Sequence, residues 1–320
     1  ELPLRNALLV AFGATRKAGV EVRKDPQVAA LLAADTPVIT VVAKSDVRHV
    51  VRALKTTLDE NLAMVRDTVE YMVGEGRRVF VDCEHFFDGY KADPEYAVAV
   101  ARTAHAAGAE AVVMCDTNGG MLPLGIARIV EAVRLAVPQA KLGIHCQDDT
   151  GCAVANTVSA VEAGVTHAQV TANGYGERTG NADLFVVGAN LALKLDIPVL
   201  TPEGMTDMVR ASNALAAMAN LPRDTHQPYV GVSSFAHKAG LHASALRVDH
   251  DLYNHIDPHL VGNDMRVLVT EMAGRASVEL KGKELGIDVS ASPEVISEIV
   301  EVVKDREAKG WTFEAADASF

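Results

Sequence analysis

Residues 142–149 have the sequence LGIHCQDD, a short apolar run that passes directly into a cluster of polar side chains. Five mainly apolar residues have the length and composition of a buried β-strand. Polar side chains at the carboxyl end of a parallel strand are where α/β proteins bind their ligands. The same pattern recurs along the chain. Runs of this kind lie at Leu8–Phe12, Val38–Ala43, Val79–Cys83, Ala111–Cys115, Leu142–Cys146 and Ala168–Ala172.

Segments with helical signals separate these runs. Leu54–Val73 carries apolar residues at roughly helical spacing, and Gly74 ends it. Asp93-Pro94 supplies an N-cap and a first-turn proline for a helix over Glu95–Ala107. Strands that alternate with helices are typical of parallel βα units, so the sequence predicts the α/β class.

Two architectures contain such units, an open doubly wound sheet and a closed barrel. Polar side chains follow nearly every predicted strand, at Lys44-Ser45-Asp46, Glu84-His85, Asp116-Thr117-Asn118, Gln147-Asp148-Asp149 and Asn173. A barrel gathers all its strand ends into one ring, whereas an open sheet uses mainly those beside its switch point. We therefore expect a (β/α)₈ TIM barrel with about six of its eight units present. The other two units belong upstream of Glu1 or do not exist.

The pattern changes after about residue 198. Thr201-Pro202-Glu203 begins a helix, the loop-rich stretch His226–His259 holds six of the eleven histidines, and an amphipathic helix follows over Ser292–Lys309. We predict a partial TIM-barrel catalytic domain over residues 1–198 and a smaller, mainly helical region over residues 199–320.

Composition excludes several classes of partner. The formal charge is −12 at pH 7, with acids and bases scattered along the chain. Such a surface disfavours nucleic acid and anionic membranes. No run of about 18 apolar residues and no charged-then-apolar leader is present. The four cysteines lack metal or redox spacing, so we expect buried thiols in a reducing cytoplasm.

Two segments are candidates for chemistry. His145 and Gln147 stand two residues apart on a predicted strand, so both side chains could face one metal ion. The aspartates that follow could orient those ligands or cap the next helix. Residues 173–181 contain three glycines and could form either an anion-binding loop or a simple tight turn.

Two further candidates have plain alternatives. Glu84 stands just past its strand and could transfer protons beside a metal, or could be a solvated loop acid. The histidine-rich segment 237–242 could be functional or could contain only surface and packing residues.

Taken together, these segments resemble those of the acyl-CoA-condensing metallolyase family. That family contains 2-isopropylmalate, homocitrate and citramalate synthases, with hydroxymethylglutaryl-CoA lyase as a distant relative. The resemblance covers essentially all 320 residues, and its specific parts are HCQDDTG (145–151) and NGYGERTGN (173–181). VDCEHFFDGY (81–90), CDTNGGMLP (115–123) and FAHKAGLHASA (235–245) most resemble the citramalate synthase branch.

The resemblance implies a role for individual residues. Metal ligands are implied at His145, at the position of Gln147 and at Asn173, and Glu84 matches the catalytic glutamate. Residues matched to substrate binding and to the loop that closes the barrel mouth are His49, Thr117, Glu177 and Gly180. The catalytic residues His242 and Tyr253 match side chains that are supplied to the neighbouring protomer, so a homodimer is implied.

The implied reaction is a Claisen-type condensation of acetyl-CoA with a 2-oxo acid, pyruvate in the citramalate branch, in branched-chain amino-acid biosynthesis. A divalent cation is implied, Mg²⁺ or Mn²⁺, with Zn²⁺ or Co²⁺ as alternatives. The enzyme would act as an acyltransferase that converts the acyl group to alkyl on transfer. Its location would be cytoplasmic, and no nucleic acid or membrane partner is expected.

Two departures from the family pattern limit this assignment. Gln147 stands where a histidine is usual, and the family's Leu-Arg-Asp-Gly segment, which supplies a metal-binding aspartate, is absent. The stretch Ala315–Phe320 matches the point where the family's regulatory domain would begin. We therefore expect these 320 residues by themselves to be inactive and poorly folded. The alternatives are a 2-isopropylmalate synthase and a truncated, degenerate relative without catalysis.

Overall fold

The computed structural model describes residues 4–238, 240–246, 248–268, 274–287 and 293–313. The chain divides into two compact units, residues 1–187 and 188–320. The division falls inside helix α7 (Leu184–Lys194), whereas our predicted boundary stands at residue 198. None of the helices in the described ranges is both long and apolar enough to cross a membrane.

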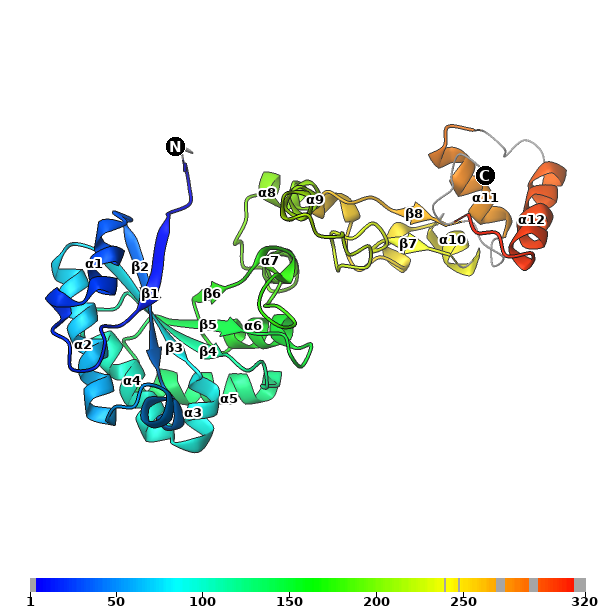
Figure 1. Cartoon of the computed structure of the whole chain (residues 1–320). Coiled ribbons are helices and arrows are strands. Elements are labelled where there is room, and N and C mark those ends of the chain that lie inside the picture. The colour runs from blue at the N-terminus through cyan, green and yellow to red at the C-terminus, as the bar shows by residue number, and fades with distance from the viewer. Residues whose placement is uncertain (1–3, 239, 247, 269–273, 288–292, 314–320) are drawn as a thin grey trace. The chain divides into compact units, whose positions relative to one another are not determined.

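Six parallel strands form one sheet in the first unit. They are β1 (Val10–Ala14), β2 (Val38–Lys44), β3 (Arg78–Glu84), β4 (Ala111–Asp116), β5 (Leu142–Cys146) and β6 (His167–Gln169). Their order in the sheet follows their order in the chain (Figure 1). A doubly wound sheet reverses its order at a switch point, whereas a barrel adds each strand beside the last. The observed order confirms the predicted TIM-barrel arrangement, with six of its eight strands described.

The first and last strands differ from their predicted bounds. β1 begins at Val10 rather than Leu8, and β6 ends at Gln169 rather than Ala172. β6 is short because the chain turns immediately after it. Residues Ala172–Gly174 form a 3₁₀ turn, η3, in which Asn173 has a left-handed backbone with φ of 56°. Within the described residues β1 pairs only with β2, and β6 only with β5, so these two strands are the sheet edges.

Helices follow the strands as the βα pattern requires. They are α1 (Pro26–Ala33), α2 (Leu58–Gly74), α3 (Phe86–Ala92), α4 (Pro94–Ala106), α5 (Pro123–Ala136) and α6 (Ala153–Glu162). α2 begins later than predicted, because Thr57 caps it, with Oγ1 accepting from the Glu60 amide at 3.1 Å. A separate π-helical turn, η2 (His49–Ala53), precedes it. The predicted Asp93 cap is confirmed, since its Oδ1 accepts from the Tyr96 amide at 3.0 Å.

The two faces of the sheet differ in polarity. The face covered by α1–α6 carries residues with no exposed surface, among them Ile39, Val41, Val81, Met114 and Ile144 (Figure 1). Alternate residues of a strand point to opposite faces, so the remaining side chains line the inner face. There the carboxyl ends of the strands carry polar, partly exposed residues. This polarity places the candidate site on the inner face.

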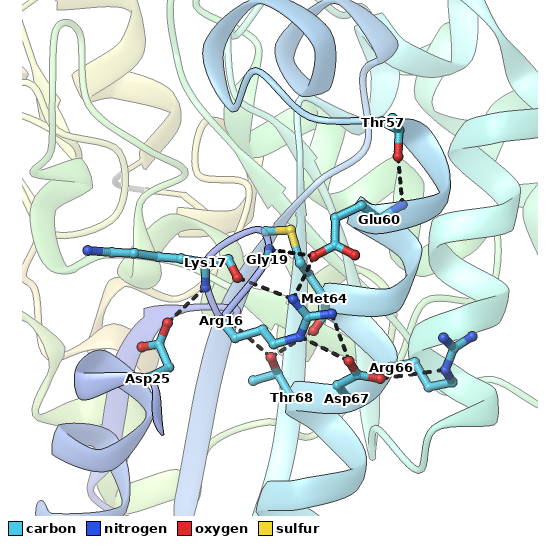
Figure 2. Close-up of polar contacts among 10 residues, drawn as sticks. All are labelled: Arg16, Lys17, Gly19, Asp25, Thr57, Glu60, Met64, Arg66, Asp67 and Thr68. Carbon is cyan, nitrogen blue, oxygen red and sulfur yellow. Dashed lines mark hydrogen bonds and ion pairs between the residues drawn. The ribbon is translucent and has the colours of Figure 1, made fainter. Parts of the chain in front are cut away.

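A buried guanidinium anchors the loop that follows β1. Arg16 is 5% exposed and lies between two acids of α2, with Nη1 2.7 Å from Glu60 Oε1 and Nη2 2.7 Å from Asp67 Oδ2 (Figure 2). Its backbone amide donates to Thr68 Oγ1 at 2.9 Å. The hydrogen bond from Arg16 is the main cause that lowers the pKa of Glu60. These bonds fix the loop because a buried arginine without its acids would be costly.

The second unit is mainly helical, as predicted. Its described elements are α8 (Pro202–Thr206), α9 (Met208–Ala219), β7 (Ala236–His237), α10 (Gly240–Leu246), η4 (His250–Leu252), η5 (Pro258–Val261), β8 (Arg266–Val267), α11 (Arg275–Glu284) and α12 (Pro293–Ala308). β7 and β8 form a short parallel pair that the sequence did not predict. The predicted start at Ser292 and the stretch Ala315–Phe320 lie outside the described residues.

Candidate active site

A layer of side chains crosses the inner face at the carboxyl ends of the strands. Lys44 is in register with Glu84, and His145 is in register with Cys115 on one side and Gln169 on the other. Glu84 and His145 stand two strands apart, which places their backbones about 10 Å from each other. The structure therefore brings the predicted general acid–base residue and the predicted metal ligand to one level of the sheet.

Glu84 is held by a cation from the neighbouring strand. Lys44 Nζ forms an ion pair with Glu84 Oε2, and the two side chains are 23% and 27% exposed. Ser45 fixes the carboxyl end of β3, because its amide and its hydroxyl both donate to the Glu84 carbonyl, at 3.1 and 2.7 Å. Glu84 is the last residue of β3 rather than a loop residue. The ion pair argues against a freely solvated acid and gives the carboxylate a defined orientation.

His145 is linked to a buried carboxyl group through one amide. Its Nδ1 lies 3.1 Å from Gln169 Oε1, and Gln169 Nε2 donates to Asp82 Oδ1 at 2.8 Å. Burial raises the pKa of Asp82 to about 6, although the bond from Gln169 opposes the rise. Burial also lowers the pKa of His145. The imidazole is thereby kept neutral, which is the form that binds metals.

The other two predicted ligands differ in their surroundings. Gln147 is 9% exposed, and its Oε1 has no hydrogen-bond partner among the described residues. A buried acceptor without a donor is costly, and a cation would satisfy it. Asn173 Nδ2 donates to Tyr175 Oη at 3.1 Å, which turns the amide oxygen away from that hydroxyl. The donor chemistry of His145 and Gln147 thus fits a divalent metal.

The candidate ligand set carries no charge. In the described ranges, no group of three or more His, Cys, Asp and Glu side chains is arranged to hold a metal ion. Hard cations such as Mg²⁺ prefer carboxylate oxygen. His145, Gln147 and Asn173 therefore fit as part of a metal site that needs an anionic ligand as well.

The predicted substrate residues His49 and Thr117 meet at His85. The rings of His49 and His85 are stacked, with centroids 3.8 Å apart, and the His85 amide donates to Thr117 Oγ1 at 2.8 Å. His85 has a left-handed backbone, with φ of 58°. Burial, and then the charge of His49, lower the pKa of His85. Thr117 keeps its hydroxyl hydrogen available for donation.

Gly180 allows the predicted loop to close on itself. Its φ is +94°, and a Cβ there would lie 2.0 Å from the Gly174 carbonyl oxygen, so only glycine fits. The Asp148 amide donates to the Gly180 carbonyl at 2.9 Å, while Asp148 Oδ1 accepts from the Ala153 amide at 2.8 Å. Asp148 thus satisfies the first amide of α6, although Cys152 occupies the N-cap position itself, and the loop is tied to the end of β5.

An arginine fastens this loop to the strand ends. Arg178 forms a bidentate pair with Asp149, with Nε and Nη2 each 2.8 Å from a carboxylate oxygen, and Nη2 also donates to the Thr117 carbonyl at 2.7 Å. Glu177 is 83% exposed, and its carboxylate lies 3.9 Å from Arg178 Nη1. The loop is consequently a fixed rim of the site with one acid facing solvent.

The last two predicted residues meet in the second unit. The rings of His242 and Tyr253 are stacked, with centroids 4.1 Å apart. His237 approaches both rings edge-on, at 6.0 and 6.4 Å, and its Nε2 lies 3.0 Å from Asn254 Oδ1. The clustering of histidines in the sequence therefore corresponds to a cluster in space.

Sequence reasoning missed four residues of this site. Lys44, Asp82, Gln169 and Arg178 were not assigned roles, although their contacts hold Glu84, His145 and the loop. A usable signal exists for Asp82, which is an acid inside the apolar run Val79–Cys83. Such a residue must find a partner on the face to which it points.

Residues 14–215 match the family model described as HMGL-like, a stretch of more than half the chain. The chain belongs to the HMGL-like family. Residues 229–310 match a second model, the homocitrate synthase post-HMGL domain-like family. The first match begins at the end of β1 and contains β2 to β6, and the second spans most of the other unit, as expected for the HMGL-like barrel followed by a helical region.

Curated relatives carry this comparison further. An (R)-citramalate synthase of Streptomyces coelicolor is 64% identical over 321 aligned residues, which cover 100% of this chain and 60% of that protein. An (R)-citramalate synthase of Aquifex aeolicus is 45% identical with the same coverages. A homocitrate synthase of Methanopyrus kandleri is 34% identical over 83% of this chain and 65% of its own length. The chain thus spans about 60% of the length of the citramalate synthases it matches.

Solved structures agree on the HMGL-like fold. The hydroxymethylglutaryl-CoA lyase of Pseudomonas aeruginosa is 22% identical, with a TM-score of 0.56 over 69% of this chain and 72% of that chain. The HMG-CoA lyase of Bacillus subtilis has the same TM-score at 17% identity, over 67% of this chain and 70% of its own.

Proposed function

We propose that the full-length protein is a citramalate synthase, which condenses acetyl-CoA with pyruvate to give citramalate and CoA. The observation that carries the proposal is the shared layer of Glu84, held by Lys44, and His145, held by Gln169. It combines a positioned proton-transfer group with a neutral imidazole on one face. The choice of pyruvate rests on the named activity of relatives up to 64% identical.

The reaction divides into steps that this chain's residues can serve. A base removes a methyl proton from acetyl-CoA, and the resulting enolate carbon forms a bond to the keto carbon of pyruvate. The new alkoxide takes up a proton, and water then cleaves the thioester to release CoA. Glu84, His242 and Tyr253 are our candidates for these proton transfers. His49, Thr117, Glu177 and Gly180 would bind and enclose the substrates.

A divalent cation would be held by His145, by Gln147 Oε1 and by Asn173. When bound, it supplies Lewis-acid polarisation of the 2-oxo group. The residues of this chain contribute neutral ligands and, through Arg178 and Gly180, a rim that limits water. Mg²⁺ and Mn²⁺ are the proposed ions, because amide oxygen is a hard donor.

Substrate preference tests the proposed function. The full-length protein, supplied with acetyl-CoA and Mn²⁺, is expected to release CoA at least about tenfold faster with pyruvate than with 2-oxoisovalerate. A pocket sized for a methyl group rejects an isopropyl group by steric overlap, whereas a larger pocket gains about 1–3 kcal/mol from it. The measurement is thiol release with each 2-oxo acid. A preference for 2-oxoisovalerate would assign 2-isopropylmalate synthase instead, and no release with any 2-oxo acid would point to a non-catalytic relative.

Subunit complementation tests whether His242 and Tyr253 act across a dimer. Glu84→Ala and His242→Ala proteins are each expected to be inactive. An equal mixture should recover about a quarter of wild-type activity, because half the dimers are hybrids and each hybrid has one intact site. The control is an equal mixture of the double variant with either single variant, which should recover no activity. Absence of recovery, with subunit exchange shown by mass spectrometry, would mean that each site draws both residues from the same protomer.

Gln147 offers a test of the metal site. An amide oxygen is a weaker ligand than imidazole, so Gln147→His in the full-length protein should lower the half-saturating Mn²⁺ concentration by about tenfold. His145→Ala is the matched control and should raise that concentration beyond the measurable range. The half-saturating concentration is measured from the rate of CoA release over a range of Mn²⁺ concentrations. An unchanged half-saturation in Gln147→His would remove this residue from the metal site.

A further inference from the structure

We propose that Gln169 and Asp82 are positioning residues that hold His145 with its ring proton on Nδ1, which leaves Nε2 as the nitrogen that binds metal. The inference rests on the proposed function, because that function assigns His145 to a metal. Neither Gln169 nor Asp82 belongs to the predicted ligand set or to the proton-transfer residues.

The direction of the Gln169 amide follows from its two neighbours. Its Nε2 lies 2.8 Å from Asp82 Oδ1, and its Oε1 lies 3.1 Å from His145 Nδ1. An ionised carboxylate can only accept, so it selects the NH₂ end of the amide. The oxygen end must then face His145 and can only accept as well. An acceptor at Nδ1 favours the proton of the neutral ring on that nitrogen, which leaves the lone pair on Nε2. The side chain of Asn181 is a second hydrogen-bond partner of the His145 ring.

The fold is arranged to make this connection across the inner face. Asp82 is on β3 and Gln169 on β6, 87 residues apart in sequence. The hydrogen bond between their side chains spans the positions of β4 and β5. Gly143 stands on β5 at the level of Asp82, in register with Val113 and His167. A Cβ at Gly143 would lie 2.8 Å from Val113 Cγ2. A side chain at this position would therefore clash with Val113 and with His167, which also lies on the inner face.

The cost of burying Asp82 supports a role beyond packing. Asp82 is 7% exposed between Phe80 and Glu84 on the inner face of β3, and its carboxylate accepts from the amide of Gln169. A carboxylate in such a place is expensive compared with a neutral residue of the same shape. An asparagine could fill the volume, but its own NH₂ group could donate to Gln169 after a flip. Only the carboxylate fixes the amide in one direction.

The test uses full-length protein, with Gln169→Leu and Asp82→Asn as variants and Thr40→Val as the matched control. Thr40 is a buried polar residue of β2 outside this connection. The first readout is the ring nitrogen chemical shifts of His145 in metal-free protein labelled with ¹⁵N-histidine, assigned with His145→Asn. The second is the dissociation constant for Mn²⁺ alone, measured by electron paramagnetic resonance. Neither readout needs turnover.

We expect wild type and Thr40→Val to show the proton on Nδ1 and equal Mn²⁺ affinity. Gln169→Leu and Asp82→Asn should both show a mixture of the two His145 tautomers and should bind Mn²⁺ about 10- to 100-fold more weakly. A purely structural role predicts weaker binding only in variants that unfold more easily, so thermal unfolding is recorded for each. Wild type that binds no Mn²⁺ would overturn the metal part of the proposed function. Binding in wild type with ring form and affinity unchanged in both variants would overturn this inference alone.

Discussion

Glu84→Gln is expected to lower kcat of the full-length protein by about 10²- to 10⁴-fold, with KM for pyruvate changed by less than about threefold. General acid–base catalysis contributes rate enhancements of this size, and an amide cannot take up the proton. Glutamine keeps the volume of glutamate and can still accept from Lys44, so the strand ends should stay in place. A loss confined to kcat is what removal of a transition-state interaction produces.

Glu110→Gln is the matched control for that variant. Glu110 also forms an ion pair with a basic residue of a neighbouring strand, with Arg78 Nε 2.6 Å from its Oε2, but Arg78 begins β3 and so stands at its amino end. Its kcat should remain within about twofold of wild type. The measurement is steady-state CoA release over a range of pyruvate concentrations. If Glu84→Gln retains more than about a tenth of kcat, Glu84 is a structural acid and the base must be sought elsewhere.

The elements of the fold were predictable because they depend on local pattern. Leu142–Cys146 was predicted with both bounds correct, since an apolar run and a polar end leave one interpretation. The error at β6 has a local cause that the pattern hides. The run Ala168–Ala172 is apolar enough for a strand, but Asn173 adopts a left-handed backbone and the turn begins at Ala172. Tertiary closure of the glycine-rich loop overrode the strand propensity.

Contacts across the site were less predictable, because the sequence of a single strand does not determine its register with the neighbouring strands. Glu84 and His145 could each be selected from the sequence because each stands at the end of a predicted strand. Their partners Lys44 and Gln169 are assigned only once register places them on the neighbouring strands. Asp82 is further removed, since its link to His145 crosses the sheet through Gln169. Sequence therefore identified the candidate side chains at the strand ends and missed their hydrogen-bond and ion-pair partners.

Asp82→Asn is expected to stabilise the full-length protein by up to about 3 kcal/mol at pH 7.5, in the absence of metal. Burial raises the pKa of Asp82 from 3.8 to about 6, with the charge of Glu84 adding to the effect and the bond from Gln169 opposing it. The folded carboxyl group thus keeps its proton up to about pH 6, whereas the unfolded one releases it near pH 4. Between these values the folded state holds the extra proton, so the free energy of unfolding falls as pH rises.

Asparagine cannot ionise, and its Oδ1 can still accept from Gln169, so this part of the pH dependence should disappear in the variant. The gain over wild type should be full above about pH 7 and should shrink toward zero near pH 4. Asp46→Asn is the control of opposite sign. Burial acts to raise the pKa of Asp46, but the bonds from Arg48 outweigh it and the net pKa is lowered. Its replacement should therefore destabilise the protein at pH 7.5 and matter less as the pH falls.

Urea unfolding at pH 4.5, 6 and 7.5 measures each difference from wild type. A stabilised Asp82→Asn protein that also binds Mn²⁺ more weakly would show that the buried carboxyl lowers stability while it directs His145. Equal stability of Asp82→Asn and wild type at all three pH values would mean that Asp82 is hydrated in the folded protein. In that case an acid on the inner face would carry no cost, and the reason to expect a positioning role from its burial would be lost.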